Sequence, residues 1–205
     1  AIRGGGHNVA GLAMCHDGIV IDMDRMKSAH VDRSRRTVRA QAGMNWGEFD
    51  RETQLFGLAT TGGQVSTTGI SGLTLGGGFG WLMGRFGLAC DNVISFQVVI
   101  ADGSVRTASA DENPDLYWAL RGGGGNFGAV VSSEFQLHPI TTVLAGMLVH
   151  PLARAGEALR FYRDYIETAP DELTVYAGVL TTPDGLDVLA FVPCYCGDDL
   201  DVGSG

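Results

Sequence analysis

A run of three glycines leads directly into a histidine near the start of the chain, in the stretch Arg3-Gly-Gly-Gly-His7. Glycine permits backbone angles and close approaches that a Cβ forbids, so three together indicate backbone pressed against a neighbour. That neighbour could be another strand or a bound phosphate. A histidine at the end of such a loop is either incidental or directed at the same ligand, and the rest of the sequence has to separate these alternatives.

Two further glycine clusters, Gly69–Gly80 and Gly122–Gly128, help to bring the total to 31 glycines in 205 residues. Each cluster alone could be a tight turn in a β-rich fold. Three together are less well explained in this way, because a glycine costs about 0.5–1 kcal/mol relative to alanine in a regular element. Backbone N–H groups of such loops form anion cradles without basic side chains, which suits an acidic protein that binds a phosphorylated cofactor.

The third cluster matches the letters G-x-G-x-x-G at Gly123–Gly128. The dinucleotide-binding version of that motif needs a strand before the loop and a helix after it. Here we expect a helix over 115–120 before the loop and a strand over 129–137 after it, so the context is inverted and we reject a Rossmann fold. No G-K-[ST] follows any glycine run, so the sequence contains no P-loop.

Charge and composition exclude several classes of partner. A net charge of -9 and a pI near 4.8 argue against nucleic acid or an anionic membrane as the main partner. No apolar run reaches the roughly 18 residues of a membrane span, and no signal-peptide pattern is present. The sequence favours a cytoplasmic bacterial protein whose oligomeric state is open.

Cysteines and histidines show no metal-binding spacing. We expect reduced thiols at the four cysteines, and surface or strand-end positions for the histidines other than His7: Cys15, Cys90, Cys194, Cys196, and His16, His30, His138, His150.

The elements that must position these loops follow from pattern and turn signals. Asn45 is a plausible N-cap of a helix with Trp46, Phe49, Thr53 and Phe56 along one face and Gly57 at its end. The remaining expectations are strands or hairpins over 19–22, 31–42, 93–101 with 105–108, 129–137, 143–150, 173–181 and 186–195, helices over 115–120 and 154–168, and a long glycine-rich loop over 60–80. A fall in glycine content near residue 140 indicates a change of domain.

The order and spacing of several motifs carry a resemblance. The chain is similar to the FAD-linked oxidases of the vanillyl-alcohol oxidase and p-cresol methylhydroxylase superfamily, in particular the berberine-bridge-enzyme-like group. The match runs from residue 1 to about 140 and rests on these stretches: R-G-G-G-H-N (3–8), W-G-E (46–48), T-T-G-I-S-G-L-T-L-G-G-G-F-G-W (67–81), G-L-A-C-D-N (87–92) and D-E-N-P-D-L-Y-W-A-L-R-G-G-G-G-N-F-G (111–128).

The resemblance implies an α+β fold in two domains. Residues 1–140 would form an FAD-binding domain of the p-cresol-methylhydroxylase type, built of two subdomains and lacking its N-terminal part. Residues 141–205 would begin a substrate or cap domain of antiparallel sheet and helices, truncated at its C-terminal end. Both ends of the chain look cut, so we expect a piece of a longer enzyme.

By the same resemblance, His7 is bonded covalently to the 8α-methyl carbon of FAD, and Gly4 to Gly6 wrap the cofactor. Many relatives carry a second, cysteinyl bond, but the corresponding position here is Val65, which predicts single attachment through His7. The expected cofactor-contacting residues are Arg3, Gly4, Gly5, Gly6, His7, Asn8, Gly11, Val65, Thr67, Thr68, Gly69, Gly72, Gly76, Gly77, Gly78, Gly80, Trp81, Asp91, Asn92, Gly128, Val130 and Val131. For Arg3 a structural ion pair is an equal alternative to a phosphate contact.

The chemistry implied is removal of hydride from a substrate carbon next to a hydroxyl or amine onto flavin N5, with O2 as acceptor to give H2O2. The partners would be a small-molecule substrate and O2. The general base is not identifiable, and only Tyr176 and Tyr195 are weak candidates; Tyr117 is expected in a helix core, and Tyr162 and Tyr165 on an amphipathic helix.

Two alternatives remain. The chain could be a truncated, non-catalytic flavoprotein-like fragment that binds little or no FAD, which the residues present leave open. A UDP-sugar reductase of the wider superfamily is disfavoured, because those enzymes lack the attachment histidine.

Overall fold

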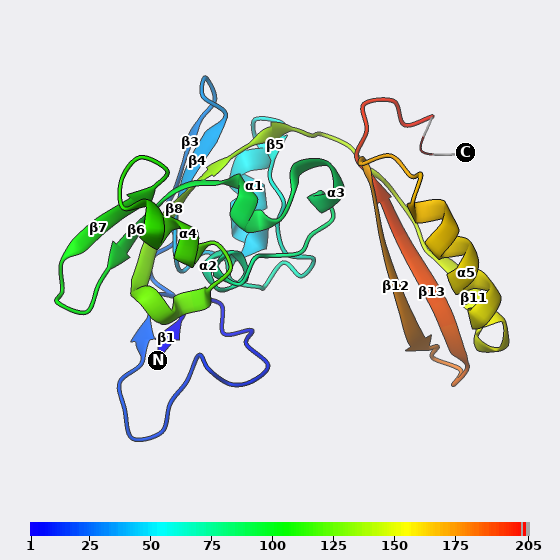
Figure 1. Ribbon diagram of the computed structural model, residues 1–205, viewed down its shortest axis with the longest axis horizontal. Helices are drawn as coiled ribbons and strands as arrows, with labels where there is room; N and C mark the ends of the chain where they lie inside the picture. Colours follow the sequence, from blue (N-terminus) through cyan, green and yellow to red (C-terminus); the bar gives the residue numbers. More distant parts are fainter. Residues whose placement is uncertain (202, 204–205) are drawn as a thin grey trace. The chain divides into compact units, whose positions relative to one another are not determined.

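The computed structural model describes residues 1–201 and 203 (Figure 1). The chain divides into two compact units, residues 1–141 and residues 142–205.

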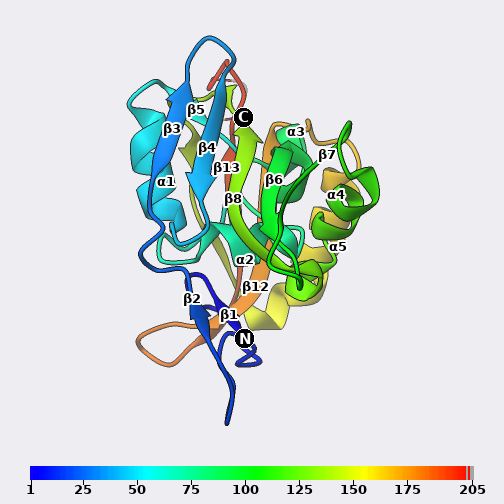
Figure 2. The same cartoon turned by 90° about the vertical axis from the view of Figure 1, so that its left-hand side faces the viewer.

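The first unit is built on a five-stranded antiparallel sheet whose strands lie in the order β3-β4-β8-β6-β7 (Figure 2). Its strands are β3 (Ala29–Asp32), β4 (Thr37–Gln41), β6 (Val93–Val99), β7 (Val105–Ser109) and β8 (Ala129–Gln136). Two small sheets flank it: β1 (Ile2–Arg3) pairs in parallel with β2 (Ile21–Asp22), and β5 (Leu58–Ala59) pairs with β9 (His138–Pro139).

Helices cover one face of the large sheet and close the core. They are α1 (Trp46–Gln54), α2 (Ile70–Leu75), α3 (Met83–Phe86) and α4 (Pro114–Leu120), with short 3-10 turns at η1 (Ala89–Asn92) and η2 (Gly124–Phe127). Trp46 and Phe49 of α1 and Phe135 of β8 are fully buried and meet edge to face, with ring centroids 5.2–6.1 Å apart. Such pairs add to the free energy gained from burying their apolar surface.

Asn45 caps α1 as the sequence predicts. Its Oδ1 accepts from the Glu48 N–H at 2.9 Å, and Glu48 Oε2 accepts from the Asn45 N–H at 3.0 Å, a capping box that satisfies two orphan donors. Phe56 falls outside the helix and is partly exposed, so its place on the helical face was wrongly predicted.

The second unit is an antiparallel sheet with a helix. Strand β13 (Asp187–Tyr195) pairs with β12 (Leu173–Thr181) along one edge and with β10 (Leu144–Ala145) and β11 (Leu148–Pro151) along the other. The 3-10 turn η3 (Leu152–Arg154) leads into α5 (Ala155–Ile166). The helix packs on the sheet through Tyr162, whose ring lies tilted against that of Phe191 and whose hydroxyl donates to the Val175 carbonyl at 3.2 Å.

The predicted α+β class with antiparallel sheets is confirmed, and two further local predictions are wrong. The stretch 60–80 is not all loop, since α2 forms within it. The expected strand over 143–150 is broken into β10 and β11. The break lies where Gly146 faces Pro193, because proline has no N–H to return the hydrogen bond that Gly146 donates to its carbonyl at 3.3 Å.

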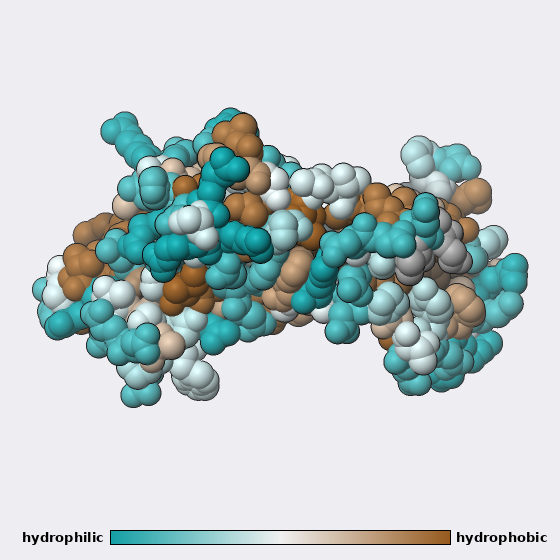
Figure 3. Space-filling model, turned by 90° about the horizontal axis from the view of Figure 1, so that it is seen from above, coloured by the Kyte–Doolittle hydropathy of each residue, from teal (hydrophilic) through white to brown (hydrophobic). Residues whose placement is uncertain are grey.

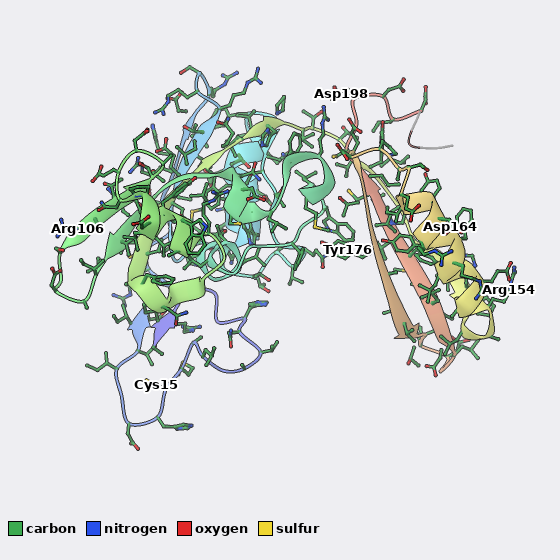
Figure 4. All side chains as sticks on the ribbon, viewed as in Figure 1. Cys15, Arg106, Arg154, Asp164, Tyr176 and Asp198 are labelled. Carbon is green, nitrogen blue, oxygen red and sulfur yellow. The ribbon has the colours of Figure 1, made fainter. Side chains whose placement is uncertain are left out.

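Apolar side chains also reach the surface of both units (Figure 3). In the first unit they include Val9 and Leu12, in the loop between β1 and β2 that also carries the exposed Cys15 (Figure 4). In the part of the chain that the structure describes, no helix is long and apolar enough to cross a membrane, and no cluster of three or more His, Cys, Asp or Glu could hold a metal ion.

Candidate cofactor site

The first two glycine clusters press directly against each other. A Cβ built on Gly5 would lie 2.3 Å from the Gly69 nitrogen, and one built on Gly69 would lie 2.3 Å from the Gly5 nitrogen. Both distances are far shorter than any real contact, so neither position accepts a side chain. The first glycine run is therefore pressed, at Gly5, against another backbone segment of the protein, the one that contains Gly69.

The third cluster joins them at the far end of α2. The Gly122 N–H donates to the Leu75 carbonyl at 3.1 Å, just before the turn Gly76–Gly78. Gly77 (φ +107°) and Gly78 (φ +90°) adopt angles that L-residues rarely take. Segments that are 64 and 47 residues apart in the chain thus converge on one short helix and leave Gly72 and Gly76 exposed at the surface.

His7 lies over the loop that precedes α2. Its Nε2 is 2.9 Å from the Thr67 hydroxyl and its Nδ1 is 3.3 Å from the Thr68 hydroxyl, while the ring stays exposed. A hydroxyl can donate to one imidazole nitrogen and accept from the other. Both tautomers are therefore satisfied, and the two threonines fix the orientation of the ring.

Some glycines around α2 are not explained by the fold, and these fit a ligand. A Cβ at Gly72 or Gly125 would meet no atom of the protein within 4 Å, and neither has a positive φ. Gly72 lies inside α2, where glycine is about 1 kcal/mol less favourable than alanine. A bound molecule that approaches the backbone closely would account for both, so the residues present fit the expected FAD.

Arg3 makes the structural ion pair that the sequence left as an alternative. Its Nη1 is 2.8 Å from Asp22 Oδ2, between paired positions of β1 and β2. The pKa of Asp22 is lowered, first by a hydrogen bond from the Asp24 N–H and then by Arg3. Arg3 therefore braces the strand that leads into Gly4, whose Cβ position has only an ordinary contact with the Ala42 carbonyl.

Other predicted contact residues are explained by local packing. A Cβ at Gly80 would lie 2.0 Å from the Gly62 carbonyl oxygen, and one at Gly128 would lie 2.7 Å from Val98. The Val130 side chain is buried in the main core. Asn8 accepts from the Leu12 N–H and, with Gly11 (φ +75°), closes a turn. Val131 packs in a smaller core cluster, and Trp81 is half-buried. Val65 is 54% exposed, and its carbonyl accepts from the Thr68 N–H.

The turn of residues 86–92, hereafter the 86–92 turn, is held by two of its own side chains and by Arg121. Asp91 accepts from the Leu88 N–H and from Arg121 Nη2, each at 2.9 Å, and Arg121 Nε donates to the Cys90 carbonyl at 2.8 Å. Asn92 is buried and donates through Nδ2 to the carbonyls of Phe86 and Leu88, both at 2.9 Å. The side chains of Asp91 and Asn92, which the sequence predicts at the cofactor, thus form hydrogen bonds within the protein.

Asn92 also has a partner that the sequence did not suggest. Nε2 of His138 lies 2.7 Å from Asn92 Oδ1, and the imidazole stacks on Phe86 with ring centroids 3.9 Å apart. His138 was expected to be an ordinary surface or strand-end residue. Nothing in its local sequence indicates the contact, because it depends on the pairing of β9 with β5.

We expect the stability of the chain to fall below neutral pH partly through His138. Burial lowers its pKa from the usual 6.5, with Arg85 and Arg36 acting in the same direction. A histidine with a lowered folded-state pKa contributes stability that is present above the unfolded value and lost as pH falls through the folded value. Urea unfolding at pH 8 and pH 5 should show a larger loss in the wild type than in His138→Gln, and equal losses would contradict this assignment.

The weak catalytic candidates lie on neighbouring strands of the second unit. Tyr195 is buried, and the backbone at Gly197 and Gly203 closes over its ring, since a Cβ at either would lie within 2.4 Å of it. Tyr176, on β12 (Figure 4), is half-buried, and its backbone lies opposite Val192 of β13. Of the other tyrosines, Tyr117 packs on the main core and donates to the Val93 carbonyl, while Tyr165 stacks on Phe161 at the surface of α5.

Comparison with known protein families gives one match over residues 1–109, to the family described as FAD binding domain. Among curated relatives, (R)-6-hydroxynicotine oxidase of Paenarthrobacter nicotinovorans is 41% identical over 149 residues, which is 72% of this chain and 32% of that protein. An FAD-linked oxidoreductase of Dictyostelium discoideum is 36% identical over 192 residues, covering 93% of this chain and 42% of that protein.

Solved structures resemble the chain closely. 6-Hydroxy-D-nicotine oxidase from Arthrobacter nicotinovorans superposes with a TM-score of 0.91 at 33% identity, covering 98% of this chain and 45% of that one. A variant of BBE-like 1 from Physcomitrella patens gives a TM-score of 0.89 at 29% identity, covering 98% and 44%. The chain thus spans less than half the length of these proteins.

Proposed function

Because the chain belongs to the FAD-binding-domain family of FAD-linked oxidoreductases, we propose that it forms the flavin-holding part of an oxidase with FAD attached covalently through His7. The oxidase would take hydride from a C–H next to a hydroxyl or amine and pass the electrons to O2, giving H2O2. Family membership confirms the resemblance to berberine-bridge-like oxidases that the motifs indicated.

The observation that carries the proposal is the position of His7. The ring is exposed, both nitrogens are oriented by threonine hydroxyls, and the threonines directly precede Gly69 and α2. An imidazole held in this way can present one nitrogen to a ligand while the other keeps its hydrogen bond. Single attachment follows because Val65, at the other attachment position of the family, has no nucleophilic atom.

The role of the chain's own residues would be to bind the FAD, orient it and shield it from solvent. FAD, when bound, supplies the two-electron acceptor. The open positions at Gly72 and Gly125 leave room for phosphate oxygens beside the backbone, so binding needs no basic side chain in a chain of net charge -9. The turn Gly76–Gly78 holds the end of α2 in place, since the Gly76 and Gly77 N–H groups donate to the Leu73 and Thr74 carbonyls. Attachment would replace one C–H bond of the 8α-methyl group and the N–H bond of His7 by a C–N bond, and the two electrons and two protons released reduce O2 to H2O2.

The test is flavin binding followed by reduction. The whole encoded protein is incubated with FAD, freed of excess cofactor, and mixed without O2 with a panel of sugars, alcohols and cyclic amines. We expect retained flavin absorbance that one member of the panel bleaches, and recovery on admission of O2 with one H2O2 per flavin. A colourless protein would instead support the alternative of a non-catalytic fragment, and bleaching without H2O2 would contradict the oxidase assignment.

A cysteine at position 65 should acquire a second bond to the flavin. The Val65 side chain is exposed, and its carbonyl anchors the loop that carries Thr67 and Thr68. In Val65→Cys we expect flavin that stays attached after denaturation even when His7 is replaced by alanine. The matched control is Ser66→Cys in the same background, which should release its flavin. Release from both variants would show that position 65 does not face the flavin ring.

A further inference from the structure

The 86–92 turn sets the position of the glycine turn at the end of α2. The Ala89 N–H donates to the Gly78 carbonyl and the Cys90 N–H donates to the Gly77 carbonyl, each at 2.9 Å. A Cβ on Gly78 would lie 2.5 Å from that of Ala89, so the two backbones are in the closest contact they can make. Any shift of the 86–92 turn must move Gly77 and Gly78 with it.

The side chain of Asn92 gives this turn its shape. Residues 87–92 follow α3 and contain one short 3-10 helix, and the Asp91 N–H donates within the turn, to the Leu88 carbonyl. Asn92 adds to this bond by donating to the Phe86 and Leu88 carbonyls, and the residue is 5% exposed. Since both hydrogens of Nδ2 are directed at carbonyls, the amide oxygen of Asn92 can only accept.

His138 satisfies that oxygen and fixes the amide. An acceptor at Asn92 Oδ1 requires that His138 Nε2 carries the hydrogen, 2.7 Å away. The imidazole comes from a segment 46 residues further along the chain and is clamped by its stack on Phe86, the residue at the start of the same turn. Arg121 holds the opposite side of the turn through Cys90 and Asp91. The 86–92 turn is therefore held by His138 of β9 on one side and by Arg121, at the end of α4, on the other.

We propose that His138 is a positioning residue for the flavin site: by donating from Nε2 to Asn92 it holds the 86–92 turn, and through the turn it holds the backbone of Gly77 and Gly78. The inference rests on the proposed function for its role in cofactor binding, whereas the mechanical link between His138 and the glycine turn stands on the hydrogen bonds alone. A buried acceptor left without its donor costs more than the bond contributes when made, so losing the Nε2 donor should loosen the turn.

Two substitutions separate the hydrogen bond from the ring. His138→Phe keeps the aromatic stack on Phe86 and removes the donor. His138→Gln removes the ring but can place an amide N–H near the position of Nε2. His150→Phe is the matched control, because His150 lies on β11 in the second unit, where its ring meets Phe191 edge to face.

The first readout is hydrogen exchange of the Ala89 and Cys90 amides in the whole protein without added FAD. We expect exchange at these two amides to rise about tenfold in His138→Phe, while amides of β6 and β8 keep their wild-type rates. His138→Gln should restore most of the protection, and His150→Phe should leave it unchanged. Unchanged exchange in His138→Phe, an equal rise at every amide, or no rescue by glutamine would overturn the proposal.

The second readout is reversible FAD affinity, measured by quenching of flavin fluorescence in a His7→Ala background. We expect binding about tenfold weaker with His138→Phe and near the background value with His138→Gln. If the wild-type protein itself binds no FAD, the proposed function fails, and the exchange measurement still decides whether His138 holds the turn. Selective loss of protection with unchanged affinity would overturn the link to the flavin site.

Discussion

Replacement of His7 by alanine should convert a flavin that survives denaturation into one that is released completely. The imidazole is the nucleophilic side chain held at the loop before α2, between the hydroxyls of Thr67 and Thr68, and alanine has no atom that can form the bond. Acid precipitation of the purified variant, followed by absorbance of pellet and supernatant, should find all flavin in the supernatant. The wild type should keep its flavin in the pellet.

The control for this experiment is His16→Ala. His16 is exposed, lies in the loop that follows His7, and is a histidine in the same part of the sequence. Its replacement should leave the flavin in the pellet. Flavin that remains bound to precipitated His7→Ala would show that another residue forms the bond, and the assignment of His7 would then be wrong.

Gly69→Ala should produce a large loss of stability together with loss of the cofactor. The Gly69 backbone has φ -66°, which alanine accepts, so the effect is purely steric. The new Cβ would lie 2.3 Å from the nitrogen of Gly5, and neither backbone segment can yield without moving His7 or α2. We expect a fall of roughly 3 kcal/mol in the free energy of unfolding, at the upper end of the usual cost of overpacking, with loss of flavin binding.

Gly72→Ala separates binding from folding. It lies three residues further on, and a Cβ there would touch nothing in the protein. Alanine inside a helix should raise the free energy of unfolding by up to about 1 kcal/mol, yet the methyl group would occupy space that we assign to the cofactor, so FAD affinity should fall. Equal destabilisation by both substitutions would contradict the packing argument, and unchanged affinity in Gly72→Ala would remove that glycine from the site.

The motifs could be predicted from sequence because they are local and densely spaced. Glycine runs, the Asn45 cap and the turn residues report backbone requirements within a few positions of themselves, and the inverted order of α4, glycine loop and β8 was enough to reject a Rossmann fold. The helix α2 was missed because Gly72 and β-branched residues lower its helix propensity. It forms because Ile70 and Leu75 bury their side chains in the core.

The sequence could not predict which glycines are required by packing and which leave open space. In the sequence, Gly5, Gly69, Gly72 and Gly80 look alike, but in the structure three of them are forced by neighbouring backbone and Gly72 alone among these is free of contacts. The partnership of His138 with Asn92 was equally out of reach. It spans 46 residues and depends on where β9 pairs, which no local pattern encodes.

The covalent bond between His7 and FAD can be read from the intact mass of the purified, denatured and desalted protein, with peptide mapping of any adduct. We expect a mass increase of one FAD less two hydrogens, located on the peptide that contains His7. An unmodified mass after growth and purification with FAD, or an adduct on a peptide without His7, would contradict it.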